Sequence, residues 1–508
     1  MAVISLLRPP LLTSKWAYIT SLCPPIGLAY IASSLLRDNH QVQVIDGIGE
    51  NPLNTFSDYR ESLQFHGLSV DDIVSRIHPK TTIVGITCMF SFEWPVVKNL
   101  LKCIKKYFPH VIIVMGGEHG TAMPEFCLRE SKYLNYIVLG EGENTICELV
   151  TTITKKERPV SDIAGIAYLD GDKFKRTTSR KRIIDINSIP EPAWNLIPLE
   201  NYLKNGLGFG VNRGKSMPII ASRGCPYRCA FCSSHSMWTT RYLSRTPESV
   251  IAEIKKYVEK YSVTNVDFYD LTAIIKKKWI IEFCKLLIKS NLQITLQLPA
   301  GTRSEALDDE VMQLFYKAGC RNLVYAPESG SKKVLNEIKK NINLLNIKKS
   351  MRSCVKSGIK SKVNIMVGFP QETKKDVFQN LFFLIELAFF GIDDITISPF
   401  TPYPGSELFV LLQKSHRIPK LNDDYFYSLL SIADLKNNIC YSEHYSNTFF
   451  FYAQSIGYLV FYGLSFSIRP IRFARLLKNI STNKHETRLE KALSNLFFRI
   501  LNWKKMIE

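Results

Sequence analysis

Six consecutive strand–helix units constrain the fold of the second half of this chain. Helical segments are predicted at Pro247–Tyr261, Asp308–Ala318 and Thr373–Ala388, each between two apolar strands. The predicted strands are Ile219–Ser222, Asn265–Tyr269, Ile294–Leu298, Asn322–Tyr325, Lys362–Val367 and Asp394–Ser398. Successive parallel βα units curl into a barrel, with functional groups at the carboxyl ends of the strands. We therefore predict a partial (β/α)6 barrel.

A second α/β pattern precedes this one. Its predicted strands are Ala2–Leu7, Val42–Ile45, Thr82–Thr87, Val111–Met115 and Tyr136–Leu139. Glycines follow two of them directly, at Gly116-Gly117 and at Gly140 and Gly142. Ligands of open parallel sheets bind at the carboxyl ends of the strands, where glycine lets a bulky group approach the backbone. This pattern predicts a Rossmann-like parallel sheet that holds a cofactor.

These patterns divide the chain into four regions. Residues 1–150 form the first sheet domain, and 151–211 form a connector with a hairpin candidate (Ile163–Tyr168 and Lys173–Thr178). Residues 212–410 form the barrel, and 411–508 form a helical region rich in aromatic and basic residues.

Composition limits the binding partners and the cellular compartment that we expect for this chain. The formal charge is +19, but many lysines are scattered as on solvated helix faces, so no nucleic-acid partner is expected. No secretory signal is visible, because Met1 leads straight into the apolar run Val3–Leu7. We therefore expect a cytoplasmic protein, in which clustered cysteines indicate metal binding or catalysis rather than disulfides.

Three of the twelve cysteines form one tight motif. Cys225, Cys229 and Cys232 are spaced C-x3-C-x2-C directly after a predicted strand. Three thiolates can hold three irons of a [4Fe–4S] cluster and leave the fourth iron open. There the amino and carboxylate groups of S-adenosylmethionine (SAM) can chelate, and reductive cleavage gives a 5′-deoxyadenosyl radical. The alternative is structural zinc with His235 as fourth ligand, but zinc ligands usually fall into two separated pairs.

This motif and four downstream segments resemble the radical SAM superfamily. The segments are Asp267–Asp270, Gly301–Arg303, Ala326–Ser331 and Val367–Thr373. Two departures from the family pattern put the local backbone in question: Ala326-Pro327 replaces Gly-Ile, and Gln371 replaces Gly. The resemblance implies SAM contacts from Phe231, Asp270, Arg303, Glu328, Ser329 and Gly368.

The first domain resembles the cobalamin-binding domain that precedes the barrel in one large subfamily. The matching pieces are Pro24–Leu28, Val84–Thr87, Gly116–His119, Gly140–Glu143 and the connector motif Ile189–Trp194. They imply cobalamin contacts from Thr87, Gly116, Gly117, Glu118, Gly140, Glu141 and Gly142. A glycine-rich sheet edge without this resemblance would fit a nucleotide equally well.

Free-standing cobalamin domains carry an Asp-x-His-x-x-Gly motif that this chain does not complete. Asp38 and His40 begin the pattern, but position 43 is Gln. No histidine is therefore expected to ligate cobalt, and we interpret His40 and His119 as surface or packing residues.

The resemblance implies a radical SAM C-methyltransferase that uses a 5′-deoxyadenosyl radical and methylcobalamin on a small substrate. Its partner would be a reducing electron donor of the flavodoxin or ferredoxin type. An oxidative cyclase of the anaerobic porphyrin type is an alternative, which the apolar tail favours mildly because it suits a lipophilic substrate. A tRNA methylthiotransferase and a non-catalytic corrinoid carrier or sensor are less favoured.

The segment 447–468 is uncharged and long enough to span a bilayer. Arg469, Arg472, Arg475 and Lys478 follow it. Aromatic residues beside a basic helix favour contact with one leaflet at the inner face of the membrane. Packing on the open edge of the barrel and a true span are the alternatives.

Overall fold

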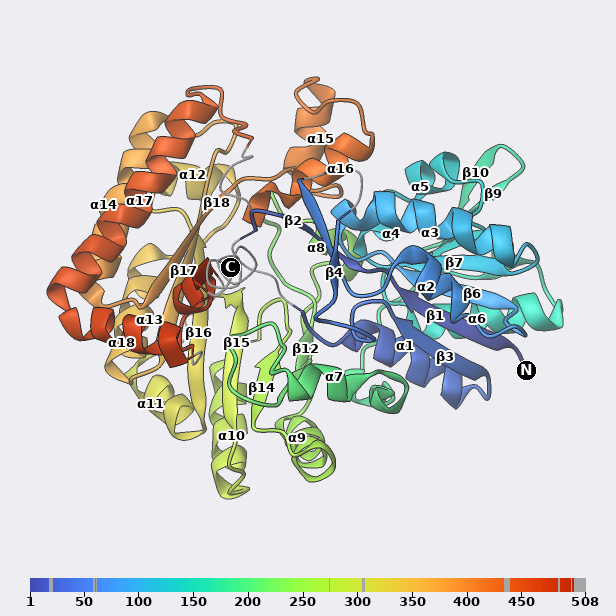
Figure 1. Ribbon diagram of the computed structural model, residues 1–508, viewed down its shortest axis with the longest axis horizontal. Helices are drawn as coiled ribbons and strands as arrows, with labels where there is room; N and C mark the ends of the chain where they lie inside the picture. Colours follow the sequence, from blue (N-terminus) through green and yellow to red (C-terminus); the bar gives the residue numbers. More distant parts are fainter. Residues whose placement is uncertain are drawn as a thin grey trace, which may run out of the picture.

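The computed structural model describes residues 1–17, 22–57, 60, 62–273, 275–303, 307–433, 439–482, 485–494 and 496–497. The chain forms two α/β lobes that lie side by side, with the N-terminal lobe at the right in Figure 1 and the barrel lobe at the left. The C-terminal helices return along the outer side of the barrel lobe.

The first lobe is built on a seven-stranded sheet of order β10-β9-β8-β7-β6-β1-β3. Five of its strands are parallel: β1 (Val3–Arg8), β3 (Gln41–Asp46), β6 (Ile83–Thr87), β7 (Ile112–Gly116) and β8 (Tyr136–Val138). Helices α1 (Ile26–Arg37) and α6 (Glu143–Lys155) contribute to one hydrophobic core, and α2 (Val70–Ser75), α3 (Trp94–Tyr107) and α5 (Pro124–Glu130) contribute to another. The sheet is thus covered on both faces, as in doubly wound folds.

The hairpin assigned to the connector extends this sheet. Strand β9 (Ile166–Asp170) pairs antiparallel with β8, and β10 (Lys173–Arg176) pairs with β9. Ile166 and Ala167 are fully buried, so the hairpin belongs to the core of the first lobe. The sheet therefore continues to Arg176, beyond the boundary predicted at residue 150.

A small antiparallel sheet of order β2-β5-β4 was not expected. Its strands, β2 (Leu11–Ser14), β4 (Thr55–Phe56) and β5 (Leu63–His66), have two to four residues each. Strands this short carry too little alternation to be recognised by periodicity.

The second lobe is a six-stranded, all-parallel sheet whose strands follow chain order. They are β11 (Ser216–Ile219), β14 (Asn265–Phe268), β15 (Thr295–Thr302), β16 (Cys320–Glu328), β17 (Lys360–Val367) and β18 (Asp394–Pro399). Its helices are α9 (Pro247–Tyr261), α10 (Lys277–Lys289), α11 (Asp309–Lys317), α12 (Lys332–Glu337), α13 (Leu344–Lys356) and α14 (Lys374–Phe390). The predicted fold class is confirmed. The first strand ends earlier than predicted, because Ser222–Arg223 forms a separate strand, β12, with β13 (Leu243–Ser244).

Short helices join the two lobes. Helices α4 (Glu118–Ala122) and α8 (Ser234–Trp238) pack against each other, and α16 (Asp423–Ser428) packs on α3. Helices α7 (Leu199–Lys204) and α15 (Glu407–Lys414) complete this region.

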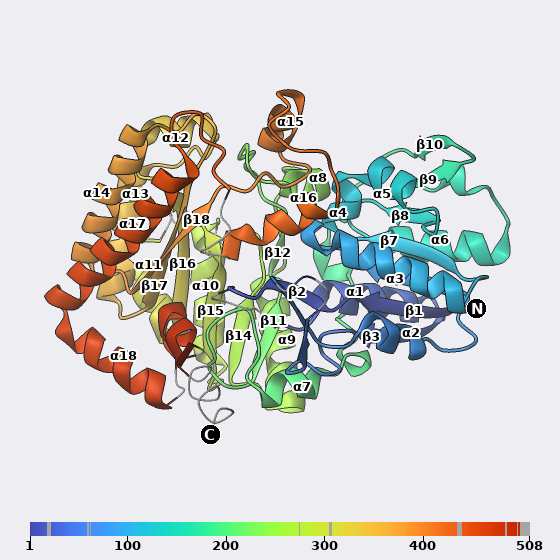
Figure 2. The ribbon, with the colours of Figure 1, turned by 45° about the horizontal axis from the view of Figure 1, so that its top comes forward.

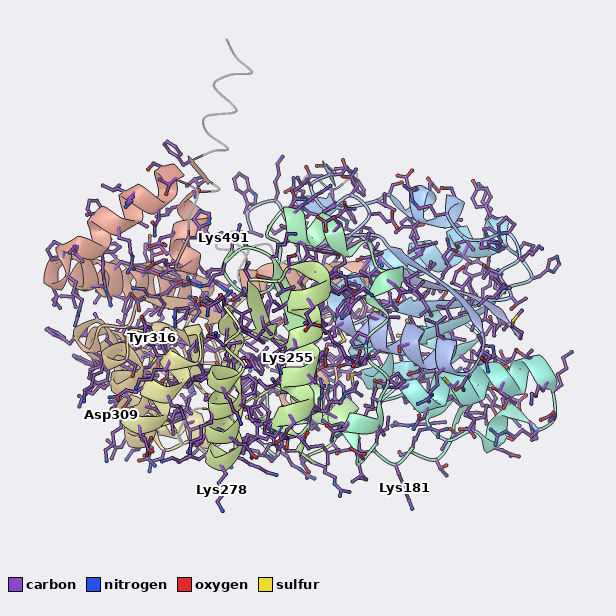
Figure 3. All side chains as sticks on the ribbon, turned by 90° about the horizontal axis from the view of Figure 1, so that it is seen from below. Lys181, Lys255, Lys278, Asp309, Tyr316 and Lys491 are labelled. Atoms are coloured by element: carbon purple, nitrogen blue, oxygen red, sulfur yellow. The ribbon has the colours of Figure 1, made fainter. Side chains whose placement is uncertain are left out.

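The C-terminal region contains the helices α17 (Asn447–Ile468) and α18 (Pro470–Thr482), which residues 485–494 and 496–497 follow. Helix α17 packs against α14 and β18, as the turned view in Figure 2 also shows. Lys181, Lys255 and Lys278 lie on three separate segments of the chain in the view from below (Figure 3).

Candidate cofactor site

The loop that carries the three cysteines is fixed at both ends. Gly224 precedes Cys225 with a φ of +86°, and an added Cβ there would lie 2.2 Å from the Arg241 carbonyl oxygen, so only glycine fits. Further along, the Ala230 N–H donates to the Ile338 carbonyl at 2.9 Å, and its carbonyl accepts from the Leu408 N–H at 2.9 Å. The thiols are therefore presented by a backbone held in one conformation.

All three thiols are partly exposed. Burial raises the pKa of Cys229 to about 11 and also raises the pKa of Cys232. Within the described ranges, no three His, Cys, Asp or Glu side chains converge on a position for a single metal ion.

Two cations lie beside the cysteine loop. The Arg303 guanidinium stacks 3.5 Å from the centre of the Tyr227 ring, and Arg303 also donates to the Asn341 carbonyl. The Lys340 ammonium donates to Glu328 at 2.9 Å, and both side chains are about nine-tenths buried. Burial lowers the pKa of Lys340, but the Glu328 carboxylate and Cys229 together outweigh this effect and hold the pKa above its ordinary value.

Glu328 itself has an unusual backbone. Its φ is +70°, a left-handed conformation that costs about 1–3 kcal/mol in a non-glycine residue and often occurs at functional sites. The preceding Ala326-Pro327 lies where the β16–β17 register shifts, between Tyr325 and Glu328. Proline cannot donate to a sheet ladder, so an irregular position is where it can be accommodated. The first departure from the family pattern is thus absorbed by a bulge.

The second departure, Gln371, leaves its turn intact. Gly368 has a φ of +100°, and its N–H donates to the Glu372 carboxylate at 2.6 Å. The Tyr445 hydroxyl donates to the same carboxylate. Gln371 is not among the positive-φ residues of the described chain, so this position does not require glycine.

Two predicted SAM ligands are engaged by the protein itself. Asp270 accepts hydrogen bonds from the Ala221 N–H at 3.2 Å and from the Ser222 hydroxyl, and burial raises its pKa to about 6. It therefore fastens the start of the cysteine loop. The Ser329 hydroxyl donates to Asn380 at 2.9 Å and is fully buried.

The carboxyl edge of the first sheet is open backbone. Thr87 and Gly116 are register partners at the ends of β6 and β7, and a Cβ added at Gly116 would meet no atom within 4 Å. Gly117 has a φ of +114°, and its added Cβ would lie 2.4 Å from the Cys88 carbonyl oxygen. Phe90, just beyond this edge, has half of its surface exposed. The edge thus offers free space bordered by an apolar side chain.

This glycine-rich edge contacts the cysteine loop directly. The Ser233 hydroxyl, next to Cys232, donates to the Glu118 carboxylate. Burial raises the pKa of Glu118. A Cβ added at Gly140 would lie 3.3 Å from the Met237 carbonyl in α8. The two predicted cofactor regions therefore adjoin each other.

Glu141, predicted to contact cobalamin, lies in a buried ion network between the lobes. It pairs with Arg182 at 2.5 Å and with Arg223 at 3.3 Å, and Arg223 also pairs with Glu143 at 2.6 Å. The Arg223 guanidinium lies 5.1 Å from the Tyr30 ring. Arg223 immediately precedes the cysteine loop, so this network ties the loop to the first lobe. Gly142 lies between the two carboxylates and packs against Ile31.

His119 is a packing residue, as the sequence indicated. It is fully buried, its Nδ1 lies 3.0 Å from the Ser91 hydroxyl, and burial lowers its pKa to about 3. His40 accepts a hydrogen bond from the Ala2 N–H at 3.3 Å, away from the glycine edge.

Two family models match the chain. One describes the B12 binding domain and matches residues 16–150, and the other describes the radical SAM superfamily and matches residues 219–384. A similar protein is the uncharacterized methyltransferase PH0819 of Pyrococcus horikoshii, 31% identical over 80% of this chain and 82% of its own length. This chain belongs to the B12-binding radical SAM family. It is an enzyme, and its cofactors are a [4Fe–4S] cluster, SAM and cobalamin.

Further matches come from a curated relative and a solved structure. The anaerobic magnesium-protoporphyrin IX monomethyl ester cyclase of Cereibacter sphaeroides is 30% identical over 78% of this chain and 61% of its own length. Among solved structures, the radical SAM methyltransferase TsrM of Kitasatospora setae, with cobalamin and a [4Fe–4S] cluster, matches with a TM-score of 0.63. The match covers 82% of this chain and 78% of TsrM at 17% identity, so it supports the fold alone.

The residues present fit these cofactors. Three thiols suit an iron–sulfur cluster, and the open glycine edge suits a large ring. In the described part of the barrel, Thr272 Oγ1 and Asn364 Oδ1 are buried without a hydrogen-bond partner. Buried polar atoms in this state are rare in native proteins, and a polar ligand would satisfy them.

Sequence reasoning missed Lys340, Arg223 and Glu372. Arg223 stands two residues before Cys225 and Glu372 lies in the segment Val367–Thr373, but neither has a predicted role. Lys340 follows α12 and has no local signal. Only the fold brings Lys340 to Glu328.

Proposed function

We propose that the chain is a radical SAM C-methyltransferase acting on a small, lipophilic substrate. When bound, the cluster and SAM supply a 5′-deoxyadenosyl radical, and cobalamin supplies the methyl group. The observation that carries the proposal is the direct contact between Glu118, at the glycine edge, and Ser233, beside Cys232. Methyl transfer needs a carbon to be activated at one cofactor and methylated from the other, so the two regions must adjoin.

Each group of residues then has a role. Cys225, Cys229 and Cys232 would hold the cluster, and Phe231, whose ring lies 6.0 Å from that of Phe369, would contact SAM beside it. Arg303 and Glu328 at the strand ends, together with Lys340 after α12, bind SAM, whose amino acid moiety carries both charges. Asp270, Ser329 and Gly368 position this region through the protein.

The first lobe holds cobalamin through the backbone of Gly116, Gly117 and Gly140, with Thr87 and Glu118 at the rim. Glu141 and Gly142 serve the lobe interface. The four functional regions are residues 1–150, 151–211, 212–410 and 411–508. The β9–β10 hairpin of the second region completes the sheet of the first. An electron donor of the flavodoxin or ferredoxin class delivers the electron, in the cytoplasm and at the inner face of the membrane.

The test uses methyl-labelled SAM with anaerobic holoenzyme and a panel of lipophilic candidates. Methylation predicts labelled product with S-adenosylhomocysteine and 5′-deoxyadenosine formed in equal amounts. Cys229→Ala abolishes the deoxyadenosine and serves as control. Substrate turnover without transferred label would overturn the proposal.

Oxidative cyclisation is the second candidate, because a cyclase is 30% identical to this chain over 78% of its length. It predicts that 5′-deoxyadenosine forms without S-adenosylhomocysteine and that ring closure removes hydrogen atoms from the substrate.

A further inference from the structure

We propose that the outer face of helices α14, α17 and α18 docks on a lipid bilayer and lies in the interface of one leaflet. This inference deepens the membrane location proposed above, and it does not depend on whether the reaction is methylation or cyclisation. It rests on the large apolar side chains that these three helices expose and on the absence of charged residues from α17.

Three hydrogen-bonding side chains of α17 attach the helix to the barrel. Gln454 donates to the Ile397 carbonyl at 2.6 Å, and Tyr458 accepts from the Ile397 N–H at 2.9 Å. One turn further, Tyr462 donates to Asp394. These three residues are four apart, so they share one face, and they satisfy the open edge of β18.

The outward face of α17 exposes large apolar side chains. Leu459 is 76% exposed, and Ile456 exposes 48% of its surface. The hydroxyl residues Thr448, Ser455 and Ser467 are exposed as well, but the helix contains no charged residue along its whole length. Large apolar side chains and neutral hydroxyls on an exposed helix suit the interfacial layer of a bilayer.

Helix α14 continues the same surface. Phe378, Phe382 and Phe389 lie on one side of this helix by their spacing, and Phe382 is 69% exposed. Figures 1 and 2 both show α14 and α17 side by side along the outer edge of the barrel. Helix α18 adds Ile471, which is 81% exposed.

The charges favour a bilayer over an acidic or mixed protein partner. No Asp or Glu occurs between residues 447 and 482. Exposed lysines stand at the margins of the face, Lys374 and Lys375 at the start of α14 and Lys478 in α18. Lysines bordering an apolar aromatic surface match anionic headgroups around an acyl layer.

The arginines after α17 do not have the role that the sequence suggested. Arg469 donates to the Ala388 and Phe389 carbonyls at 2.9 and 3.0 Å, and Arg472 donates to the Ile392 carbonyl at 2.7 Å. Arg475 pairs with Asp393 and Glu490. They fasten α18 to the barrel, so the binding should be mainly hydrophobic and weakly dependent on salt.

A transmembrane span fits less well. Helix α17 is long and apolar enough to cross a bilayer, with a mean hydropathy of 1.2 over its most apolar 18 residues. However, 33% of those residues are buried in the protein. Spanning would pull Gln454 and Tyr458 away from the backbone of β18 and place unsatisfied polar groups in hydrocarbon.

The experiment is vesicle flotation of the anaerobic holoenzyme. Vesicles of phosphatidylcholine, alone and with one quarter phosphatidylglycerol, are compared at low and high salt. The test variant is Phe382→Ser/Ile456→Ser/Leu459→Asn. The control variant, Leu53→Asn/Tyr107→Ser/Ile184→Ser, removes three comparably exposed apolar side chains from the first half of the chain.

The wild type and the control are expected to float with both vesicle types, and the test variant should bind at least tenfold more weakly. High salt should reduce binding by less than threefold. Iron content and 5′-deoxyadenosine formation should be unchanged in the test variant. If they fall, the single variant Leu459→Asn replaces it, with an expected loss of about threefold.

Two results would overturn the inference. One is a wild type that stays with the soluble fraction, whether or not it forms a dimer that the test variant abolishes. The other is a test variant that floats like the wild type. Neither result bears on methyl transfer, which the labelled-SAM assay measures separately.

Discussion

The carboxyl edges of the two sheets differ in chemistry although both are built from parallel βα units. The first edge is glycine and backbone, with open space at Gly116 and a close backbone approach at Gly117. The barrel edge carries thiols and the buried Glu328–Lys340 pair. A large rigid ring is selected by shape, whereas SAM carries charges that need oriented partners. One architecture thus serves two cofactors by changing only the residues at the carboxyl ends of its strands.

The largest expected effect comes from a substitution that changes the chemistry of the barrel edge and leaves the first edge unaffected. Cys229→Ala should lower 5′-deoxyadenosine formation by roughly 10³-fold or more, because the cluster loses a ligand. Cobalamin content should not change, since the first edge uses no thiol. Iron analysis, product chromatography and cobalamin extraction measure the three quantities. Cys103→Ala, in α3, is the matched control, and unchanged iron in Cys229→Ala would refute the cluster assignment.

The second-largest expected effect is on the free energy of unfolding, when the ion network between the lobes loses Arg223. Arg223→Met leaves Glu141 and Glu143 buried without this partner, which should destabilise the protein by about 3–5 kcal/mol. Arg158→Met removes a more exposed pair with Glu148 and should cost less than about 1 kcal/mol. Thermal unfolding of both variants checks the difference. Equal losses would mean that the network does not hold the lobes together.

The glycine edge can be tested with two neighbouring residues. Gly117→Ala should cost about 2–3 kcal/mol, because its positive φ excludes a side chain. Gly116→Ala should leave stability unchanged but weaken cobalamin binding, since its Cβ would enter the open space. Thermal unfolding and cobalamin titration separate these effects. Tight cobalamin binding by Gly116→Ala would place the ring elsewhere.

The smallest expected effect is the pH dependence of stability that Glu372, at the barrel edge, produces. Burial raises the pKa of Glu372 to about 7, so the folded protein keeps it protonated where the unfolded chain is ionised. Its contribution to stability is complete below about pH 4.5 and is lost as pH rises through 7. Between pH 6 and 8 the wild type should lose about 1 kcal/mol that Glu372→Gln does not lose. Unfolding midpoints of both proteins at these two pH values test this, and parallel pH profiles would contradict it.

Much of the molecule was predictable from local pattern. The helix at residues 247–261 was placed correctly because Thr246 caps it and Pro247 starts it. The order of the barrel strands followed from right-handed βα connections. The β9–β10 hairpin was recognised, but its place at the sheet edge depended on burial of Ile166, which no local signal specifies.

The cysteine loop and the succession of βα units were determined by the sequence alone, because both depend on spacing along the chain. Only the tertiary structure decided that Glu141 pairs with Arg223, that Lys340 meets Glu328, and that Gln454 of α17 bonds the backbone of β18. Each of these is a contact between segments far apart in sequence, whose partner is chosen by packing and by the need to satisfy buried charge.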